Sequence, residues 1–274
     1  MKYSLPLFFL LLSLCCQAQP IRLAGQVLAK ESGSGLPYVN IGILEKNIGT
    51  ASDEQGRFAL DLPREHQQET LTFSAVGYEE LSVPVAELRS MQPLVIKLQE
   101  KEMQLQEVVV RSRKLRVRRL GVTGRLSVVW GQPEQKEGHD IYEFANFINV
   151  KGRETELLSA HFYLTSSKLD SALFRINLYK DRGGFPGERL VEKSIVQRLS
   201  AKEGWVSINL ESFSVYTDDN FFLGIEYLPA ANTDKFAVTL GGTLGGTSYS
   251  RKSSLGAWEK FSGVSLSGYV TVQQ

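Results

Sequence analysis

The residues of this chain that could do chemistry are few and widely separated. Its three histidines, His66, His139 and His161, share no short spacing such as H-x-x-x-H that would let two imidazoles bind one metal ion. Adjacent carboxylates occur at Asp218 and Asp219, whereas a glycosidase needs two carboxylates about 5 to 9.5 Å apart across its fold. Because these two precede "NFF", they are better interpreted as a polar turn that leads into a strand.

Two further segments look like parts of catalytic or nucleotide motifs but lack the partners that those motifs need. The glycine-rich "GGTLGGTS" (Gly241 to Ser248) has no following lysine and no helix to hold a phosphate, so we interpret it as a flexible loop between strands. The "SSLG" around Ser253 and Ser254 is not a G-x-S-x-G element and has no neighbouring histidine or carboxylate. The sequence therefore predicts no catalytic residue, no metal site and no cofactor.

The segment "NIGTASDEQGRFAL" contains two adjacent oxygen donors, Asp53 and Glu54. A calcium loop is one interpretation, but a single pair falls short of the six or more oxygens that Ca²⁺ takes. The alternative is a tight turn in which Asp53 accepts hydrogen bonds from backbone N–H groups and Gly56 adopts a positive φ, so that Phe58 points inward. We favour the turn.

The chain begins with the pattern of a secretory signal peptide. Lys2 is followed by the uncharged apolar run "LPLFFLLLSL" and the small-residue exit "CQAQ", so the mature chain is expected to begin at Gln19. The run is too short to span a bilayer, and no later stretch reaches the ~20 apolar residues required, so no transmembrane segment is expected in the mature chain. A lipoprotein anchored through Cys15 or Cys16 is the competing interpretation, and the residue before either cysteine is not the usual small one.

Composition excludes several classes of function. The 31 Lys and Arg residues balance 30 Asp and Glu residues, so no global charge favours nucleic acid or an acidic substrate. Hydrophobic residues make up 42% of the chain, which is enough for a substantial core. After signal removal, the usual ~100 to 200 residues per domain predict two domains or one large β domain.

Apolar residues alternate with polar ones along many short segments, which predicts antiparallel strands in β-sandwiches. In the first part, inward-facing sets are expected in "IRLAGQV", "YVNIGILE", "RFALDL", "LTFSAVGY" and "LVIKLQE". In the second part they are expected in "SAHFYLTS", "LFRINLYK" and "GWVSINLES", with "NFFLGIEYL", "FAVTLGG" and the terminal "SGYVTVQQ" continuing the series. A brief helix is expected around "PVAELRSM". The fold class predicted is all-β, with two antiparallel β-sandwich domains, the second a jelly roll.

The segments "GQVLAKESGSGLPYVNIGI", "GTASDEQGRFALDLP", "LTFSAVGYEELSV" and "LVIKLQE" follow one another and are closed by "LQEVVV". This succession resembles the carboxypeptidase-regulatory-like domain, which is common in secreted and outer-membrane proteins of Bacteroidetes. The resemblance covers Ile21 to about Leu98, with "EVVV" (Glu107 to Val110) as the trailer. It implies a small transthyretin-like β-sandwich that has no catalytic residues of its own and that packs against or displays a neighbour.

In many relatives the same module precedes the plug and barrel of a TonB-dependent transporter. In this chain a basic stretch, "RSRKLRVRRLGVTGR", follows Val110, and only about 150 residues come after it. That is too few for a plug and a 22-stranded barrel. A TonB-contacting role for Glu107 to Val110 stays open beside an extra strand or an extended linker. The second half resembles the C-terminal part of two-domain Bacteroidetes proteins, which have no established activity, through "LYKDRGGFPGERLV", "GWVSINLESFSV", "NFFLGIEYLP" and "RKSSLGAWEKF".

The basic stretch "RSRKLRVRRLGVTGR" has two interpretations. An edge strand could hide Leu115 and Val117 while its cations contact phosphates of lipid headgroups or lipopolysaccharide. A solvated linker whose charges prevent edge-to-edge aggregation is favoured. The predicted organisation is a signal peptide over 1–18, the regulatory-like β-sandwich over 19–98, the EVVV segment and basic linker over 99–125, and a jelly-roll-like β-sandwich over 126–274.

The function expected is that of a secreted cell-envelope interaction or structural module without catalytic activity, located in the periplasm or at the outer-membrane surface. Its partner would be an envelope or outer-membrane protein, and no nucleic acid is expected. The alternative is a surface-associated carbohydrate-binding protein, and a hydrolase ranks third. Sugars are recognised by flat aromatic rings, for which Trp205, Trp258, Tyr249 and Trp130 are candidates. Alternation sets Trp205 opposite the apolar face of its strand, so its exposure is favoured.

Overall fold

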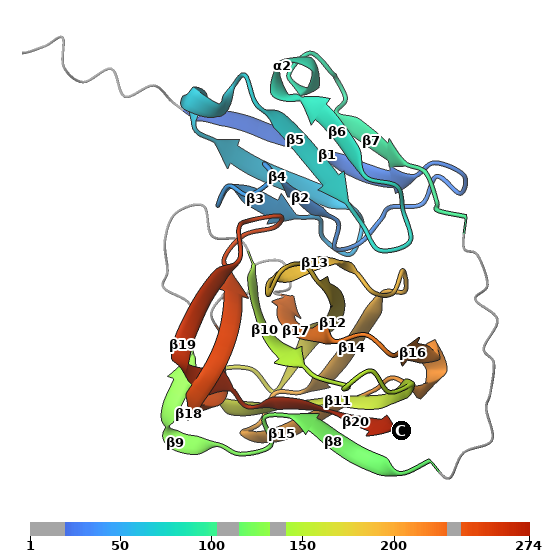
Figure 1. Ribbon diagram of the computed structural model, residues 1–274. Helices are drawn as coiled ribbons and strands as arrows, with labels where there is room; N and C mark the ends of the chain where they lie inside the picture. The colour runs from blue at the N-terminus through green and yellow to red at the C-terminus, as the bar shows by residue number, and fades with distance from the viewer. Residues whose placement is uncertain (1–19, 103–114, 132–140, 229–236) are drawn as a thin grey trace, which may run out of the picture.

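The computed structural model describes residues 20–102, 115–131, 141–228 and 237–274 (Figure 1). The predicted signal peptide over 1–18, Cys15, Cys16, His139 and the Glu107 to Val110 segment lie outside the described residues. Two β-domains are stacked on each other, with the N-terminal domain above the C-terminal domain in this view. The predicted all-β class and sandwich architecture are confirmed, but the prediction of purely antiparallel sheets is corrected, because Val95–Leu98 pairs in parallel with 26–29 in the N-terminal domain. No helix among the described residues is long and apolar enough to cross a membrane.

The N-terminal domain is a sandwich of two sheets that enclose one core. The first sheet has the order β4-β1-β7 and the second β3-β2-β5-β6. The strands are β1 (Ile21–Ala29), β2 (Asn40–Gly42), β3 (Gly49–Ala51), β4 (Arg57–Leu62), β5 (Thr70–Ser74), β6 (Leu81–Pro84) and β7 (Val95–Leu98). Two short helices complete the domain, η2 (Arg64–His66) and α2 (Val85–Leu88), the latter within the segment where a brief helix was expected.

The alternation read from the sequence becomes burial in this domain. Along β4 every second side chain, Phe58, Leu60 and Leu62, is buried, and the intervening residues are exposed. The turn before β4 is built as predicted, because Asp53 Oδ1 accepts from the backbone N–H of Gln55 at 2.9 Å and from that of Arg57 at 2.8 Å. Gly56 has φ +78°, the left-handed conformation that favours glycine.

The C-terminal domain is built from thirteen connected strands. Its main path runs β13-β12-β17-β10-β18-β11-β20-β8, with β14, β15, β16, β19 and β9 branching from it. The strands are β8 (Val117–Gly121), β9 (Leu126–Gly131), β10 (Tyr142–Ile148), β11 (Thr155–Ser167), β12 (Ser171–Asp181), β13 (Pro186–Arg189), β14 (Ile195–Ser200), β15 (Gly204–Asn209), β16 (Val215–Thr217), β17 (Phe221–Leu228), β18 (Val238–Arg251), β19 (Glu259–Leu266) and β20 (Gly268–Gln273). A short helix, η3 (Glu211–Phe213), precedes β16.

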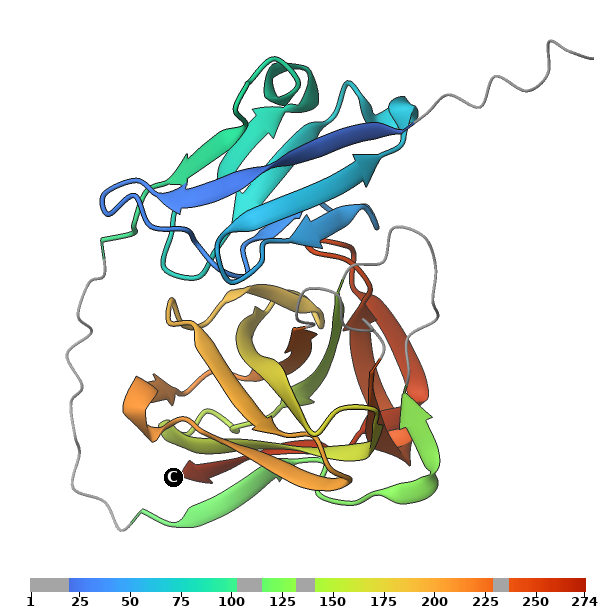
Figure 2. The ribbon, with the colours of Figure 1, turned by 180° about the vertical axis from the view of Figure 1, so that it is seen from behind.

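These strands form two layers around one apolar core. The upper layer, β12, β17 and β10, faces the N-terminal domain, and the lower layer, β15, β11, β20 and β8, lies at the opposite end of the molecule in both views (Figures 1 and 2). The long strand β18 joins the layers, since its first part pairs with β11 and its last part with β10. Phe162 of β11 and Phe174 of β12 meet in the core, with ring centroids 4.9 Å apart.

Three predictions about this half are corrected. Gly241 to Ser248 is not a loop between strands, because it lies inside β18, where the glycines leave room for the close approach of β19 and β9. The linker predicted over 99–125 ends too late, because Val117–Gly121 pairs with β20 as β8 and so belongs to the second domain. The edge-strand interpretation expected Leu115 and Val117 to be hidden. The structure corrects this, since the Val117 side chain is 65% exposed.

Candidate functional site

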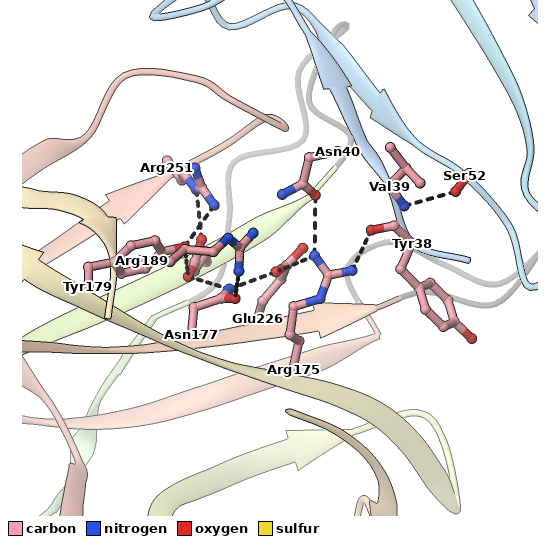
Figure 3. Close-up of polar contacts among 11 residues, drawn as sticks. Tyr38, Val39, Asn40, Ser52, Arg175, Asn177, Tyr179, Arg189, Glu226 and Arg251 are labelled. Atoms are coloured by element: carbon pink, nitrogen blue, oxygen red, sulfur yellow. Dashed lines mark hydrogen bonds and ion pairs between the residues drawn. The ribbon is translucent and has the colours of Figure 1, made fainter. Parts of the chain in front are cut away.

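The upper layer of the C-terminal domain carries a buried cluster of charged and polar side chains on its outer face (Figure 3). We call it the ionic cluster, and it consists of Glu143, Arg175, Asn177, Tyr179, Arg189, Glu226 and Arg251. Strand alternation explains its position, because the inward side of β12 is filled by apolar residues and its outward side by the polar ones. That outward side is covered by the N-terminal domain, so the charges of Glu143, Arg175, Glu226 and Arg251 are buried, whereas Arg189 is partly buried.

One half of the ionic cluster is centred on Glu143, which is fully buried. Arg251 Nε donates to Glu143 Oε2 at 2.6 Å, and Arg251 Nη2 donates to the Tyr179 hydroxyl at 2.9 Å. Tyr179 and Asn177 both donate to Glu143 Oε1, at 2.8 and 2.7 Å. Burial by itself would lower the pKa of Arg251, but Glu143, Tyr179 and Glu226 together outweigh burial and raise that pKa, so Arg251 carries its positive charge.

The other half joins the two domains through Arg175. Arg175 Nη2 donates to the Tyr38 carbonyl oxygen at 2.6 Å, and Nη1 donates to Asn40 Oδ1 at 3.3 Å. The same guanidinium lies 3.4 Å from Glu226 Oε2. Three buried atoms of this half have no hydrogen-bond partner among the described residues, namely Asn40 Nδ2, Arg175 Nε and Glu226 Oε1. Such atoms are uncommon in folded proteins and are expected to have a reason.

Further contacts hold the domains together around Arg175. Glu192 accepts from the Gly77 backbone N–H at 3.3 Å and from Lys101 Nζ at 2.7 Å. The loop after β18 reaches the N-terminal domain, where the Leu255 carbonyl accepts from the Glu45 N–H at 2.9 Å. A Cβ placed on Gly42 would come 2.4 Å from the Ser254 carbonyl oxygen, so glycine permits this approach.

A cleft of about 690 Å³ opens between the domains beside the ionic cluster. Its floor includes Asn40, Tyr179, Arg189 and Arg251, and Trp258 forms part of its wall. The Trp258 ring is partly buried, packs edge-on against Tyr179 at 5.6 Å, and has the Arg251 guanidinium 5.0 Å from its centroid. The cleft is thus lined by the buried Arg251, the partly buried Arg189 and the Trp258 ring.

The lower layer presents a second concentration of unusual side chains, on the surface that points away from the N-terminal domain. We call it the Trp205 face, and it consists of Trp205, Tyr163, Tyr269, His161, Arg119 and Arg125. Trp205 is 41% exposed, and its ring contacts Tyr269 at 5.1 Å and Tyr163 at 5.5 Å, both edge-on.

Arginines and a histidine complete the Trp205 face. The Arg125 guanidinium lies 4.3 Å from the Tyr163 ring centroid, and that of Arg119 lies 5.5 Å from the Tyr269 centroid. His161 is stacked on Tyr269 at 4.4 Å. Burial, with the Arg119 charge added to it, lowers the pKa of His161, so the imidazole is neutral at pH 7. On this face Trp205 is the exposed aromatic ring, Tyr163 and Tyr269 are buried rings that support it, and Arg119 and Arg125 are exposed cations.

Three of the four aromatic candidates predicted from the sequence lie in different environments, and the side chain of the fourth, Trp130, lies outside the described part of the structure. Trp205 is exposed, as strand alternation indicated, and Trp258 lines the cleft between the domains. Tyr249 does not present its ring to solvent, because it is only 5% exposed and packs against Phe222 and Phe185. It fills a small apolar cluster on the outer side of the upper layer, so we withdraw it as a platform residue.

The other residues singled out for chemistry are not brought together. Ser253 and Ser254 are fully buried where the loop after β18 meets the N-terminal domain. Asp218 and Asp219 are exposed in the turn before β17. His66 lies beside Glu65, with 3.4 Å between Nε2 and Oε1. No group of three or more His, Cys, Asp or Glu residues within the described ranges is placed to hold a metal ion.

Sequence reasoning missed the ionic cluster. The apolar side of "LFRINLYK" predicts a core-facing strand, and alternation alone turns the opposite side, with Arg175, Asn177 and Tyr179, to solvent. The sequence of β17, "FFLGIEYL", could have indicated the cluster. Both faces of this strand are apolar, and it contains a single charge, Glu226. A strand that is apolar on both faces is covered on both faces, and a charge within it needs a buried partner.

Comparison with known proteins identifies one part of the chain. Residues 23–110 match the family model described as CarboxypepD_reg-like domain, so the N-terminal domain is a domain of this kind. The match includes the sandwich described above and ends at the last residue of the "EVVV" segment. A search of curated proteins gives no match.

Two solved structures illustrate how distant the structural likenesses are. The cysteine protease and lectin-like domains of Cwp84, a surface layer associated protein of Clostridium difficile, are 13% identical with a TM-score of 0.38, over 49% of this chain and 32% of that one. The infectious bursal disease virus VP2 subviral particle is 8% identical with a TM-score of 0.28, over 86% and 59%. This chain therefore spans less than two thirds of either protein, and at these scores neither bears on function.

Proposed function

We propose that this protein is a secreted, non-catalytic interaction module of the bacterial cell envelope. Its two β-sandwich domains act as one unit, and the Trp205 face is the surface that contacts the partner. The observation that carries the proposal is the composition of that face, where an exposed tryptophan lies between two tyrosines and two arginines are stacked on the tyrosine rings. Tryptophan, tyrosine and arginine are the residue types that dominate binding energy in protein interfaces.

The order of this surface supports a binding role. The edges of the Tyr163 and Tyr269 rings hold the Trp205 indole, and the tyrosines in turn position Arg125 and Arg119. Side chains that are already ordered lose little conformational entropy on binding, so more of the contact energy appears as affinity. The face also lies at the end of the molecule opposite to the N-terminal domain, where a large partner meets no obstruction from that domain (Figure 2).

The domain contacts support the idea of a single unit. Arg175 fastens β12 to the Tyr38 carbonyl, and Glu192 fastens the segment between β13 and β14 to Gly77 and Lys101. A CarboxypepD_reg-like domain that is held in this way sets the direction in which the Trp205 face points. We propose that the N-terminal domain is the spacer or display element and that the C-terminal domain is the recognition element.

Binding of carbohydrate is the second candidate function, and the exposure of the Trp205 ring favours it. Sugars stack their apolar faces on such rings, and hydroxyl groups beside the ring add hydrogen bonds. Ser207 follows Trp205 by two residues on the same side of β15, and Thr271 lies two residues beyond Tyr269 on β20. A glycan and a protein partner would use the same ring, so one substitution tests both.

The test is a pull-down from detergent-solubilised envelopes of the source organism, run beside a glycan array, with wild type, Trp205→Ala and Phe185→Ala. Phe185 is the matched control because it is exposed to the same 41% and lies in the turn between β12 and β13, away from the Trp205 face. We expect Trp205→Ala to lose a stoichiometric protein partner that Phe185→Ala keeps. A Trp205-dependent glycan signal without a protein partner would establish the second candidate. If wild type and both variants capture the same partner equally well, the proposal that the Trp205 face contacts the partner is refuted.

A further inference from the structure

We propose that the cleft between the two domains is a second binding site, which takes a small ligand through a carboxylate group. This site goes beyond the proposed function, because it lies on the other side of the C-terminal domain from the Trp205 face and takes a different ligand. Its floor is formed by Arg189, Arg251 and Asn40, and its wall by Trp258. No residue of the Trp205 face takes part in it.

The first reason is the charge balance of the ionic cluster. Three arginines, Arg175, Arg189 and Arg251, face only two carboxylates, those of Glu143 and Glu226. Arg251 is paired with Glu143 and Arg175 with Glu226, whereas Arg189 donates only to the neutral Asn177 amide oxygen, at 2.6 Å. The cluster therefore has one excess positive charge beside the cleft. Arg189 is partly buried, and a charge that is partly removed from water attracts an anion more strongly than a fully solvated one.

The second reason is the set of unused N–H donors around that charge. Arg251 uses Nε and Nη2, and Arg189 uses Nη1, so each guanidinium has N–H groups left without a partner in the described part of the chain. Asn40, fully buried and part of the cleft lining, has an Nδ2 without a partner. In Figure 3 this nitrogen points away from Arg175, toward the side where Arg189 and Arg251 are drawn. Residues with unused N–H donors from three elements, β2, β13 and β18, thus line the same cleft.

The rim of the cleft limits which anion fits. Lys101 is paired with Glu192 at 2.7 Å and Lys180 with Glu188 at 3.9 Å, so these rim cations are already compensated. Further rim carboxylates, those of Glu45, Glu79 and Glu80, are exposed and repel a highly charged molecule. A polyphosphate or a nucleic acid is therefore disfavoured, whereas a single carboxylate reaches the floor with little repulsion because exposed charges are screened by solvent.

The size and the wall of the cleft define the remainder of the ligand. A volume of about 690 Å³ corresponds to a molecule of the size of a disaccharide or a short peptide. The Trp258 ring offers an apolar surface for the part that follows the carboxylate. An acidic sugar and the C-terminus of a peptide share this chemistry, a carboxylate attached to a compact and partly apolar group. The experiment separates these two sources.

The test is isothermal titration calorimetry of the mature protein with D-glucuronate and with N-acetyl-Ala-Ala as its free acid. D-glucose and N-acetyl-Ala-Ala amide are the neutral counterparts. We expect one of the acids to bind at least about tenfold more tightly than its neutral counterpart, because the counterpart lacks the charge that Arg189 and Arg251 recognise. Binding of the sugar acid would assign an acidic saccharide, and binding of the peptide acid a peptide C-terminus.

Variants connect the binding to the excess charge. Arg189→Gln keeps a donor toward Asn177 but removes the cation, and we expect it to weaken acid binding at least about tenfold. Arg182→Gln is the control, because Arg182 is an exposed cation on the rim of the same cleft. Thermal unfolding of each variant checks that the fold is intact. Equal binding of acid and neutral compounds, no effect of Arg189→Gln, or no saturable heat at about 10 mM of either acid would overturn the proposal.

Discussion

Replacing Arg175 by methionine removes the guanidinium that joins the two domains and keeps an apolar side chain of similar length. Arg175 is 3% exposed and lies 3.4 Å from the fully buried Glu226. Among the described residues, the substitution leaves that carboxylate with only the Asn177 amide as a donor, at 3.0 Å. It also leaves the Tyr38 carbonyl without the donor that now lies 2.6 Å away. A buried negative charge and a buried acceptor are thus both deprived of their main partner.

The magnitude follows from these two losses. Breaking a buried ion pair by removing one partner costs about 3 to 5 kcal/mol, because the other charge stays buried and uncompensated. The carbonyl adds about 1 kcal/mol, and better packing of the methionine stem offsets a similar amount. We therefore expect Arg175→Met to lower the free energy of unfolding by about 4 kcal/mol. The double variant Arg175→Met/Glu226→Leu removes the orphaned charge and should recover most of the loss.

The assay is urea unfolding followed by tryptophan fluorescence and by far-UV circular dichroism. All three tryptophans belong to the C-terminal domain, whereas circular dichroism reports both domains. In the wild type the two transitions should coincide, and in Arg175→Met they should separate because the domains are no longer coupled.

The control is Arg198→Met, since Arg198 and Glu54 form an exposed interdomain pair at 3.6 Å that is worth about 0.5 kcal/mol. A loss below about 1 kcal/mol for Arg175→Met, or a double variant less stable than the single one, would refute the reasoning.

Two further outcomes are expected. Gly42→Ala should destabilise the protein by about 2 kcal/mol in the same urea assay, because its Cβ would lie 2.4 Å from the Ser254 carbonyl oxygen, while Gly124→Ala, with no atom within 4 Å, should be neutral; equal stability of both variants would contradict this. Burial and the Arg119 charge lower the folded-state pKa of His161, so the unfolded chain takes up the proton first and stability should fall as pH drops below about 6.5 and through that lowered pKa. The dependence of the free energy of unfolding on pH, measured from pH 7.5 to 5, should be weaker in His161→Gln than in the wild type. An unchanged pH dependence would show that another group is responsible.

Local patterns in the sequence were sufficient to predict the elements. Alternation placed Phe58, Leu60 and Leu62 in the core, and it placed Trp205 on the side of β15 that is now seen to be exposed. The turn at Asp53 was predictable for the same reason, because its hydrogen bonds join residues at most four positions apart. A period of two residues and the chemistry of a turn are properties of a few consecutive residues, so they survive without knowledge of the fold.

Predictions failed where a residue's environment depends on a distant segment. The glycines of Gly241 to Ser248 look like a loop until β19 and β9 are placed beside them, and Tyr249 looks like a platform until Phe222 covers it. Val117–Gly121 looks like a linker until β20 pairs with it. In each example the missing information is which strand comes to lie beside which, and strand pairing joins residues that are far apart in the chain.

Local patterns predict an all-β chain, and the family resemblance of its first part implies a regulatory-like sandwich, because both depend on short stretches of sequence. The tertiary structure was needed to show that Arg175, which alternation alone would turn to solvent, is buried, contacts Tyr38 and Asn40, and is the partner of Glu226. The physical reason is that burial of a strand's second face depends on what covers it. In this protein a different domain covers it, and the residues in contact are about 135 positions apart.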